Sequence, residues 1–121
     1  MELYCKKCNQ KLTLTPLQHA YKEELNPNGQ KDLLKSGMYI FTDEAEYMLE
    51  NFDVLVAYDS INLVNHKDRS RFIGCCGPGD FNVYNQICPN CSAEIGVLID
   101  DCWTDRFIGI DSSKVATKPL W

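Results

Sequence analysis

Two short cysteine pairs are the residues of this chain whose type and spacing most clearly indicate chemistry. Cys5 and Cys8 form one Cys-x-x-Cys pair, and Cys88 and Cys91 form a second pair that begins 80 positions (88 − 8) after the first one ends. Four thiolates are the ligand set of a closed, tetrahedral zinc site that stabilises a fold. Zn²⁺ held by both pairs would join the N-terminus to the C-terminal third, so the sequence predicts a single domain over residues 1–121.

The second pair also has the spacing of a thioredoxin-like redox motif. That motif follows a buried strand and opens a helix. Residues 93–99 here are rich in apolar and β-branched types and include a glycine, which favours a strand instead. The residue after a zinc knuckle often takes a left-handed backbone conformation, which suits Asn9 and suits Ser92 less well. We therefore expect zinc, with a redox pair as the alternative.

The other three cysteines are Cys75 and Cys76, inside the run Gly74-Cys75-Cys76-Gly77-Pro78-Gly79, and Cys102. The glycines predict a tight loop, because glycine reaches backbone conformations closed to other residues. Three interpretations stay open: buried packing, which is common for free cysteine, a second metal or thiol cluster that includes Cys102, and a reactive thiol. No histidine is placed by spacing to activate a thiol, so no catalytic residue is predicted.

Hydrophobic patterning predicts mainly strands around these cysteines. We expect strands at residues 11–15, 38–41, 54–57, 94–101 and 106–110, the last of these being the final strand. Short helical segments are expected at residues 17–25 and 60–64, and a longer helix near 43–52. The fold class predicted is therefore α+β, mostly β: a small single domain centred on a zinc ribbon, with one or two short helices.

The helix predicted near 43–52 would be amphipathic. Ala45, Met48, Leu49 and Phe52 recur at helical spacing and would form its buried stripe. The residues away from that stripe would form an acidic face that includes an exposed aromatic ring: Glu44, Glu46, Tyr47 and Glu50. Such a face is either simply solvated or a contact surface for a basic protein partner, in which tyrosine supplies contact area and carboxylates steer association.

Composition narrows the class of protein. The chain has 121 residues, 45% of them hydrophobic, and a formal net charge of −5. A hydrophobic core is therefore available besides any metal, and the negative charge argues against a nucleic-acid partner. No apolar run is long enough to span a membrane, and no charged-then-apolar leader precedes Cys5. Seven cysteines are an odd number for a disulfide framework, so we expect a cytoplasmic location with reduced thiols.

The assembled motifs resemble those of a group of small bacterial zinc-ribbon-like proteins. That pattern comprises an N-terminal Cys-x-x-Cys, a central Gly-Cys-Cys-Gly, a second Cys-x-x-Cys preceded by an asparagine and followed by a glutamate, and a late Asp-Cys-Trp. The corresponding residues here, besides Cys5, Cys8, Cys88 and Cys91, are Gly74–Gly77, Asn85, Glu94 and Asp101-Cys102-Trp103. The resemblance implies a metal-ribbon fold and favours joint action of Cys75, Cys76 and Cys102. It implies no activity.

The leading functional interpretation is a non-catalytic, zinc-stabilised protein-interaction module. Its most specific form is an immunity or inhibitor protein whose acidic surface covers a basic toxin or nuclease. One alternative is a cysteine-based enzyme or redox sensor that uses the Gly-Cys-Cys-Gly loop. The other is a nucleic-acid-binding zinc ribbon, which the net charge disfavours.

Overall fold

A seven-stranded, mostly antiparallel sheet forms the centre of the computed structural model, which describes residues 1–26, 31–47 and 49–121. The prediction of an α+β, mostly β fold is confirmed. The strand order is β2 (Gln18–His19), β3 (Met38–Phe41), β4 (Val54–Val56), β8 (Phe107–Ile110), β7 (Glu94–Ile99), β6 (Gln86–Ile87) and β5 (Val64–Asn65). Only the β2–β3 pair is parallel among these. A separate two-stranded sheet pairs β1 (Tyr4–Cys5) with β9 (Val115–Ala116).

The central strands β4, β8 and β7 are buried on both faces because apolar residues occupy consecutive positions along them. Val54 and Val56 face one core cluster, whereas Leu55 between them faces the other. The first cluster also contains Cys5 and Cys88, so the metal-binding cysteines belong to the core on that face of the sheet.

The prediction of a helix near 43–52 is wrong in its length, because the helix in the structure is much shorter. The helix α1 covers only Thr42–Ala45, and its C-cap residue, Glu46, has a left-handed φ of 56°. The chain then turns inward, where Tyr47, Leu49 and Phe52 contact the second core cluster. Hydrophobic spacing was compatible with a longer helix, but these residues meet the core from an irregular segment. Met48 lies outside the described residues.

Other segments also differ from expectation. Residues 17–25 contain β2 and the 3-10 turn η1 (Lys22–Glu24) instead of an α-helix, and residues 60–64 form no helical turn. Instead, Ile61 pairs with Thr13 through an isolated bridge. The strand expected at 38–41 is present with the predicted bounds, and those expected at 54–57, 94–101 and 106–110 are present with slightly shorter bounds. The last strand is β9, which follows the 3-10 turn η3 (Ser112–Lys114).

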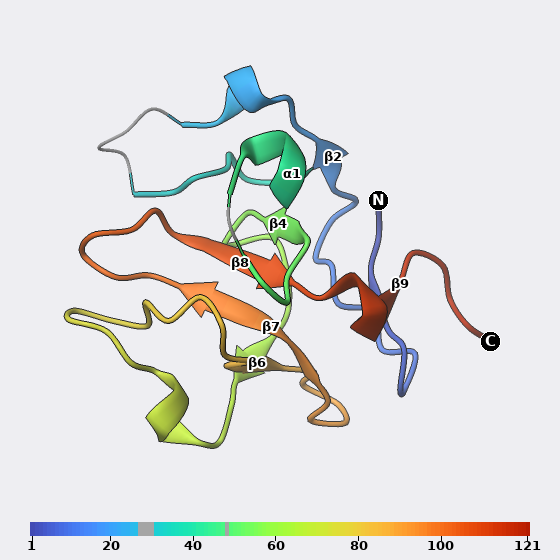
Figure 1. Ribbon diagram of the computed structural model, residues 1–121. Coiled ribbons are helices and arrows are strands. Elements are labelled where there is room, and N and C mark those ends of the chain that lie inside the picture. Colours follow the sequence, from blue (N-terminus) through green and yellow to red (C-terminus); the bar gives the residue numbers. More distant parts are fainter. Residues whose placement is uncertain (27–30, 48) are drawn as a thin grey trace.

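Figure 1 shows the two cysteine-rich regions at opposite ends of the molecule. The termini and both knuckles lie at the right, and the loop of residues 72–80 (yellow) lies at the left beside the β7–β8 connection. The strand β7 runs between the two regions, and its six residues span about 20 Å. Among the described residues, no helix has the length and apolarity required to cross a membrane.

Candidate metal centres

The four-cysteine centre is formed by Cys5, Cys8, Cys88 and Cys91, whose sulfur atoms all lie within 4.8 Å of one another. The Sγ atoms of Cys5 and Cys91 are 3.6 Å apart, and those of Cys8 and Cys88 are 3.7 Å apart. A tetrahedral zinc ion with Zn–S bonds of about 2.3 Å places its sulfurs about 3.8 Å apart. The sulfur positions therefore fit a tetrahedral metal ion, with Cys5 and Cys88 fully buried.

Two knuckles with the same backbone hydrogen bonds present these sulfurs. In the first, the N–H of Cys5 donates to Gln10 O and the N–H of Asn9 donates back to Cys5 O. In the second, the N–H of Cys88 donates to Ala93 O and the N–H of Ser92 donates back to Cys88 O. The two halves of the centre are therefore equivalent turns, although their sequences share only the cysteine spacing.

Burial and neighbouring amides perturb the thiols of this centre. Burial raises the pKa of Cys88 to about 12, whereas a hydrogen bond from the Asn90 side chain lowers the pKa of Cys8 to about 6. Bound metal requires all four groups as thiolates. An ion bound at this centre would therefore displace the proton of the Cys88 thiol.

The three-cysteine centre consists of Cys75, Cys76 and Cys102, whose sulfur atoms also lie within 4.8 Å of one another. All three residues are exposed, in contrast to the four-cysteine centre. Cys75 and Cys76 lie in the loop that follows the 3-10 turn η2 (Arg69–Arg71), and Cys102 lies in the β7–β8 connection. Of the interpretations left open by the sequence, a cluster that includes Cys102 agrees with these positions, and buried packing does not.

The carboxylate of Asp101 joins the two segments of the three-cysteine centre. Its Oδ1 accepts hydrogen bonds from the N–H groups of Cys76 at 2.9 Å and Cys102 at 2.7 Å, and its Oδ2 accepts one from Cys75 at 3.1 Å. These donors, the Cys76 N–H first, lower the pKa of Asp101 to about 2. The carboxylate is thus ionised at neutral pH and fixes the backbone of all three cysteines. Sequence analysis missed this role, because Asp101 looks like one member of a charged turn.

Glycines of the loop allow it to close around this carboxylate. A Cβ atom on Gly74 would lie 2.7 Å from Asp101 Oδ2, and one on Gly79 would lie 2.6 Å from the same atom. Both distances are too short for any side chain. The backbone itself is closer still, because a Cβ atom on Gly74 would lie 1.8 Å from Gly77 O and one on Gly77 would lie 2.3 Å from Asp100 O. The tight loop predicted from the glycines is confirmed, and it closes both on its own backbone and on Asp101.

Among the described residues, no histidine is in contact with these three thiols. Both histidines of the chain are engaged elsewhere: His19 contacts Glu44 at 2.7 Å, and His66 contacts Glu94 at 3.0 Å. The pKa of Cys102 is raised to about 12, first by its hydrogen bond with Cys76. The three sulfur atoms are close enough together to hold one metal ion.

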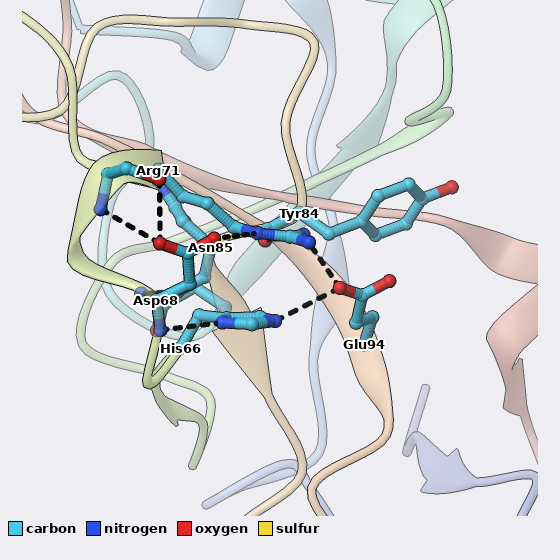
Figure 2. Close-up of polar contacts among 8 residues, drawn as sticks. His66, Asp68, Arg71, Tyr84, Asn85 and Glu94 are labelled. Carbon is cyan, nitrogen blue, oxygen red and sulfur yellow. Dashed lines mark hydrogen bonds and ion pairs between the residues drawn. The ribbon is translucent and has the colours of Figure 1, made fainter.

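A polar network connects the second knuckle to the loop of the three-cysteine centre (Figure 2). Arg71 donates from Nη1 to Glu94 Oε2 at 2.6 Å and to the carbonyl of Tyr84 at 3.0 Å. The Nδ1 atom of His66 accepts from the Asp68 N–H, so its Nε2 carries the proton that faces Glu94 in the neutral ring. Because Glu94 Oε2 contacts both Arg71 and His66, the network acts as a clamp between η2 and the start of β7. The sequence offered no signal for this pairing.

The residues predicted to form an acidic contact face do not form a single helical surface. Glu44 pairs with His19, and Glu46 pairs with Lys22 at 2.6 Å. The Tyr47 side chain is half-buried, donates to Asp105 Oδ2 and packs against Phe107 with ring centroids 5.0 Å apart. The expectation of an exposed Tyr47 is therefore wrong, because its ring covers part of the core.

Comparisons with known protein families, with curated proteins and with solved structures find no match to this chain.

Proposed function

We propose that this protein is a non-catalytic ion-binding protein, with a structural zinc ion at the four-cysteine centre and a second, exchangeable thiophilic ion at the three-cysteine centre. The observation that carries the proposal is the convergence of three exposed sulfur atoms within 4.8 Å at a fixed loop. Closed sites of four thiolates suit structural zinc, whereas a site with three protein ligands keeps a position open.

The contrast in burial supports different roles for the two centres. Cys5 and Cys88 are part of the first core cluster, so loss of an ion there would expose the core and leave buried thiols without partners. Cys75, Cys76 and Cys102 contribute to neither core cluster. An ion at the three-cysteine centre can therefore leave while the fold remains intact.

The proposal is tested by loading the reduced protein separately with Zn²⁺, Cd²⁺ and arsenite and then measuring bound element per chain. For at least one of Zn²⁺, Cd²⁺ and arsenite, we expect the wild type to bind one ion more per chain than the C75S/C76S/C102S variant. The two proteins should have the same far-UV circular dichroism and the same thermal stability. Equal content of every element in both proteins would exclude ion binding at the three-cysteine centre.

A second candidate function is the interaction with a basic protein that the sequence indicates. The observation in its favour is an open hollow of about 470 Å³ beside α1, lined by Asp43, Tyr47, Leu49, Glu50 and Asn82. It combines two carboxylates with the edge of an aromatic ring, which suits a lysine or arginine side chain. An immunity or inhibitor role against a basic toxin or nuclease would use this surface.

This second candidate is tested by charge reversal at Glu50, because Glu46 is already paired with Lys22. The proteins that co-purify with the wild type and with E50K are compared, and E46K serves as the matched control on the same segment. Loss of a basic partner with E50K, and a weaker effect of E46K, would support the interaction. Identical partners for all three proteins would contradict it.

A further inference from the structure

The three-cysteine centre offers three donor atoms and no fourth. In the part of the chain that the structure describes, no further cysteine, histidine or carboxylate joins this group. Asp101 is the nearest candidate, but both of its oxygens accept backbone N–H groups from the loop and from Cys102. Because all three cysteines are exposed, an ion bound by their sulfur atoms would have its remaining side open to solvent.

The loop holds these donors in place before any ion arrives. Three hydrogen bonds to Asp101 fix the backbone of each cysteine, and the Asp100 N–H donates to Pro78 O at 2.8 Å. The Gly79 N–H donates to Ile73 O at 2.8 Å and closes the loop on itself. A preorganised set of three thiols favours ions that use three sulfur bonds over ions that need the loop to rearrange.

Ions differ in what they require beyond three sulfurs. Zinc in a thiolate site is tetrahedral, so it would need a water molecule or a foreign ligand as its fourth partner. Trivalent arsenic forms three bonds and carries a lone pair in the remaining direction, and it is a soft acceptor suited to thiolate ligands. The geometry at Cys75, Cys76 and Cys102 satisfies arsenic completely and zinc only in part.

Zinc and arsenic also differ in the net charge of the complex that each forms with three thiolates. Zinc bound by three thiolates leaves a net charge of −1 beside the ionised Asp101 carboxylate. An arsenic(III) trithiolate is neutral, and it forms without a change of oxidation state. In that step arsenous acid reacts with three thiols, each As–O bond is replaced by an As–S bond, and three water molecules leave.

The surroundings of the centre combine one charged pair with exposed apolar side chains. Lys31 Nζ donates to the Asp101 carbonyl at 2.6 Å and pairs with Asp100 Oδ1 at 2.9 Å, so both of these charges are already engaged. Trp103, next to Cys102, is 86% exposed, and Ile73, two residues before Cys75, is 60% exposed. Neither residue offers a charge or an oxygen ligand that would complete the coordination of a divalent ion. A neutral complex with an outward lone pair is compatible with such surroundings.

We propose that the three-cysteine centre is a selective site for trivalent arsenic or its heavier analogue antimony, bound as a neutral trithiolate by Cys75, Cys76 and Cys102. This inference rests on the proposed function and specifies its ligand class. The vicinal pair Cys75-Cys76 supplies two of the bonds. Cys102, brought from the β7–β8 connection by Asp101, supplies the third.

The test uses the full chain with zinc at the four-cysteine centre. Arsenite is titrated against the wild type and against C75S, C76S and C102S, with bound arsenic measured by native mass spectrometry. Each single substitution leaves two bonds, so we expect the affinity for arsenite to fall at least about tenfold in every variant. Phenylarsine oxide has only two exchangeable positions and serves as the control ligand. It should still bind each single variant, and far-UV circular dichroism checks separately that the variant is folded.

Two outcomes would overturn the inference while leaving the proposed function intact. The first is arsenite affinity that is unchanged in C102S, which would mean that the vicinal pair binds alone. The second is displacement of arsenite by equimolar Zn²⁺ or Cd²⁺, which would mean that the site prefers divalent ions. Failure of all three ions to bind in a cysteine-dependent way would instead contradict the proposed function itself.

Discussion

Asn9 and Ser92 occupy equivalent positions, each directly after the second cysteine of a knuckle, and both have a left-handed backbone with φ of 66° and 65°. They differ in what their side chains do. Asn9 accepts a hydrogen bond from the Leu120 N–H at 2.7 Å and donates to Trp121 O at 3.2 Å, which attaches the C-terminal residues to the first knuckle. Ser92 is exposed, and its side chain makes no hydrogen bond to the described residues.

Replacing Ser92 with glycine should therefore stabilise the zinc-loaded protein. Glycine removes the left-handed strain but increases the freedom of the unfolded chain, so we expect a net gain of about 0.5–1 kcal/mol in the free energy of unfolding. The measurement is denaturant unfolding at fixed zinc concentration. Asn9→Gly is the matched control and should gain nothing, because it also loses the bonds to Leu120 and Trp121. An equal gain in both variants would contradict this explanation.

Ligand removal should distinguish the two metal centres. Cys88→Ser places a hydroxyl at a fully buried ligand position and should abolish tight zinc binding at the four-cysteine centre, with a large fall in melting temperature. Cys102→Ser changes an exposed residue and should leave the melting temperature of the zinc-loaded protein within about 2 °C of the wild type. Similar melting temperatures for the two variants would contradict the assignment of a structural role to the four-cysteine centre alone.

The Tyr84–Asp111 hydrogen bond should make stability depend on alkaline pH. Tyr84 Oη donates to Asp111 Oδ2 at 2.6 Å, and burial, followed by this carboxylate, raises the pKa of Tyr84 to about 12 from its ordinary value of 10.0. Because the pKa is raised in the folded state, the contribution is complete below pH 10 and is lost as the pH rises from 10 to 12. We expect Tyr84→Phe to be less stable by about 1 kcal/mol at pH 8, with the difference disappearing by pH 12.

The measurement for Tyr84 is the free energy of unfolding of both proteins across this pH range. Thiols titrate in the same range in both proteins, so only the difference between the two curves is informative. A difference that stays constant from pH 8 to pH 12 would show that the hydrogen bond to Asp111 does not control the titration of Tyr84.

Arg71 should stabilise the fold through the clamp shown in Figure 2. Arg71→Met removes the donor to Glu94 and to the Tyr84 carbonyl while it keeps much of the apolar stem, so we expect a loss of about 1–2 kcal/mol in the free energy of unfolding. Arg69→Met is the matched control on the same 3-10 turn. Arg69 is exposed, and its substitution should change stability by less than about 0.5 kcal/mol. Equal effects would mean that the clamp contributes nothing beyond surface charge.

Gly79 should be required for ion binding at the three-cysteine centre and not for the fold. In Gly79→Ala, the new Cβ would lie 2.6 Å from Asp101 Oδ2 and 3.1 Å from Asp101 Cβ, so the loop must move away from the carboxylate. We expect arsenite affinity to fall at least about tenfold while zinc at the four-cysteine centre is retained. Titration of arsenite, with elemental analysis of zinc, checks both parts. Unchanged arsenite affinity would show that contact between the loop and Asp101 does not organise the thiols.

The local features of this protein can be predicted from its amino-acid sequence alone. The Cys-x-x-Cys spacing indicates each knuckle, because ligands three positions apart can point to one ion in a single turn. Apolar runs within residues 54–57, 94–101 and 106–110 predict strands, since strands covered on both faces do not need to alternate with polar residues. Gly74 and Gly79 predict a tight loop, because glycine alone tolerates such close approach.

Which distant segments come into contact depends on the packing of the whole chain. The helix predicted near 43–52 ends at Ala45, because Tyr47 and Phe52 pack on the sheet and their burial outweighs the helical preference of an eight-residue pattern. The meeting of Cys102 with Cys75 and Cys76 depends on one carboxylate at the end of β7 that collects backbone N–H groups from two segments. Almost every residue type has a backbone N–H group, so the sequence does not show which residues donate hydrogen bonds to this carboxylate. The sequence therefore carries the three thiols of this centre, and the fold brings them together.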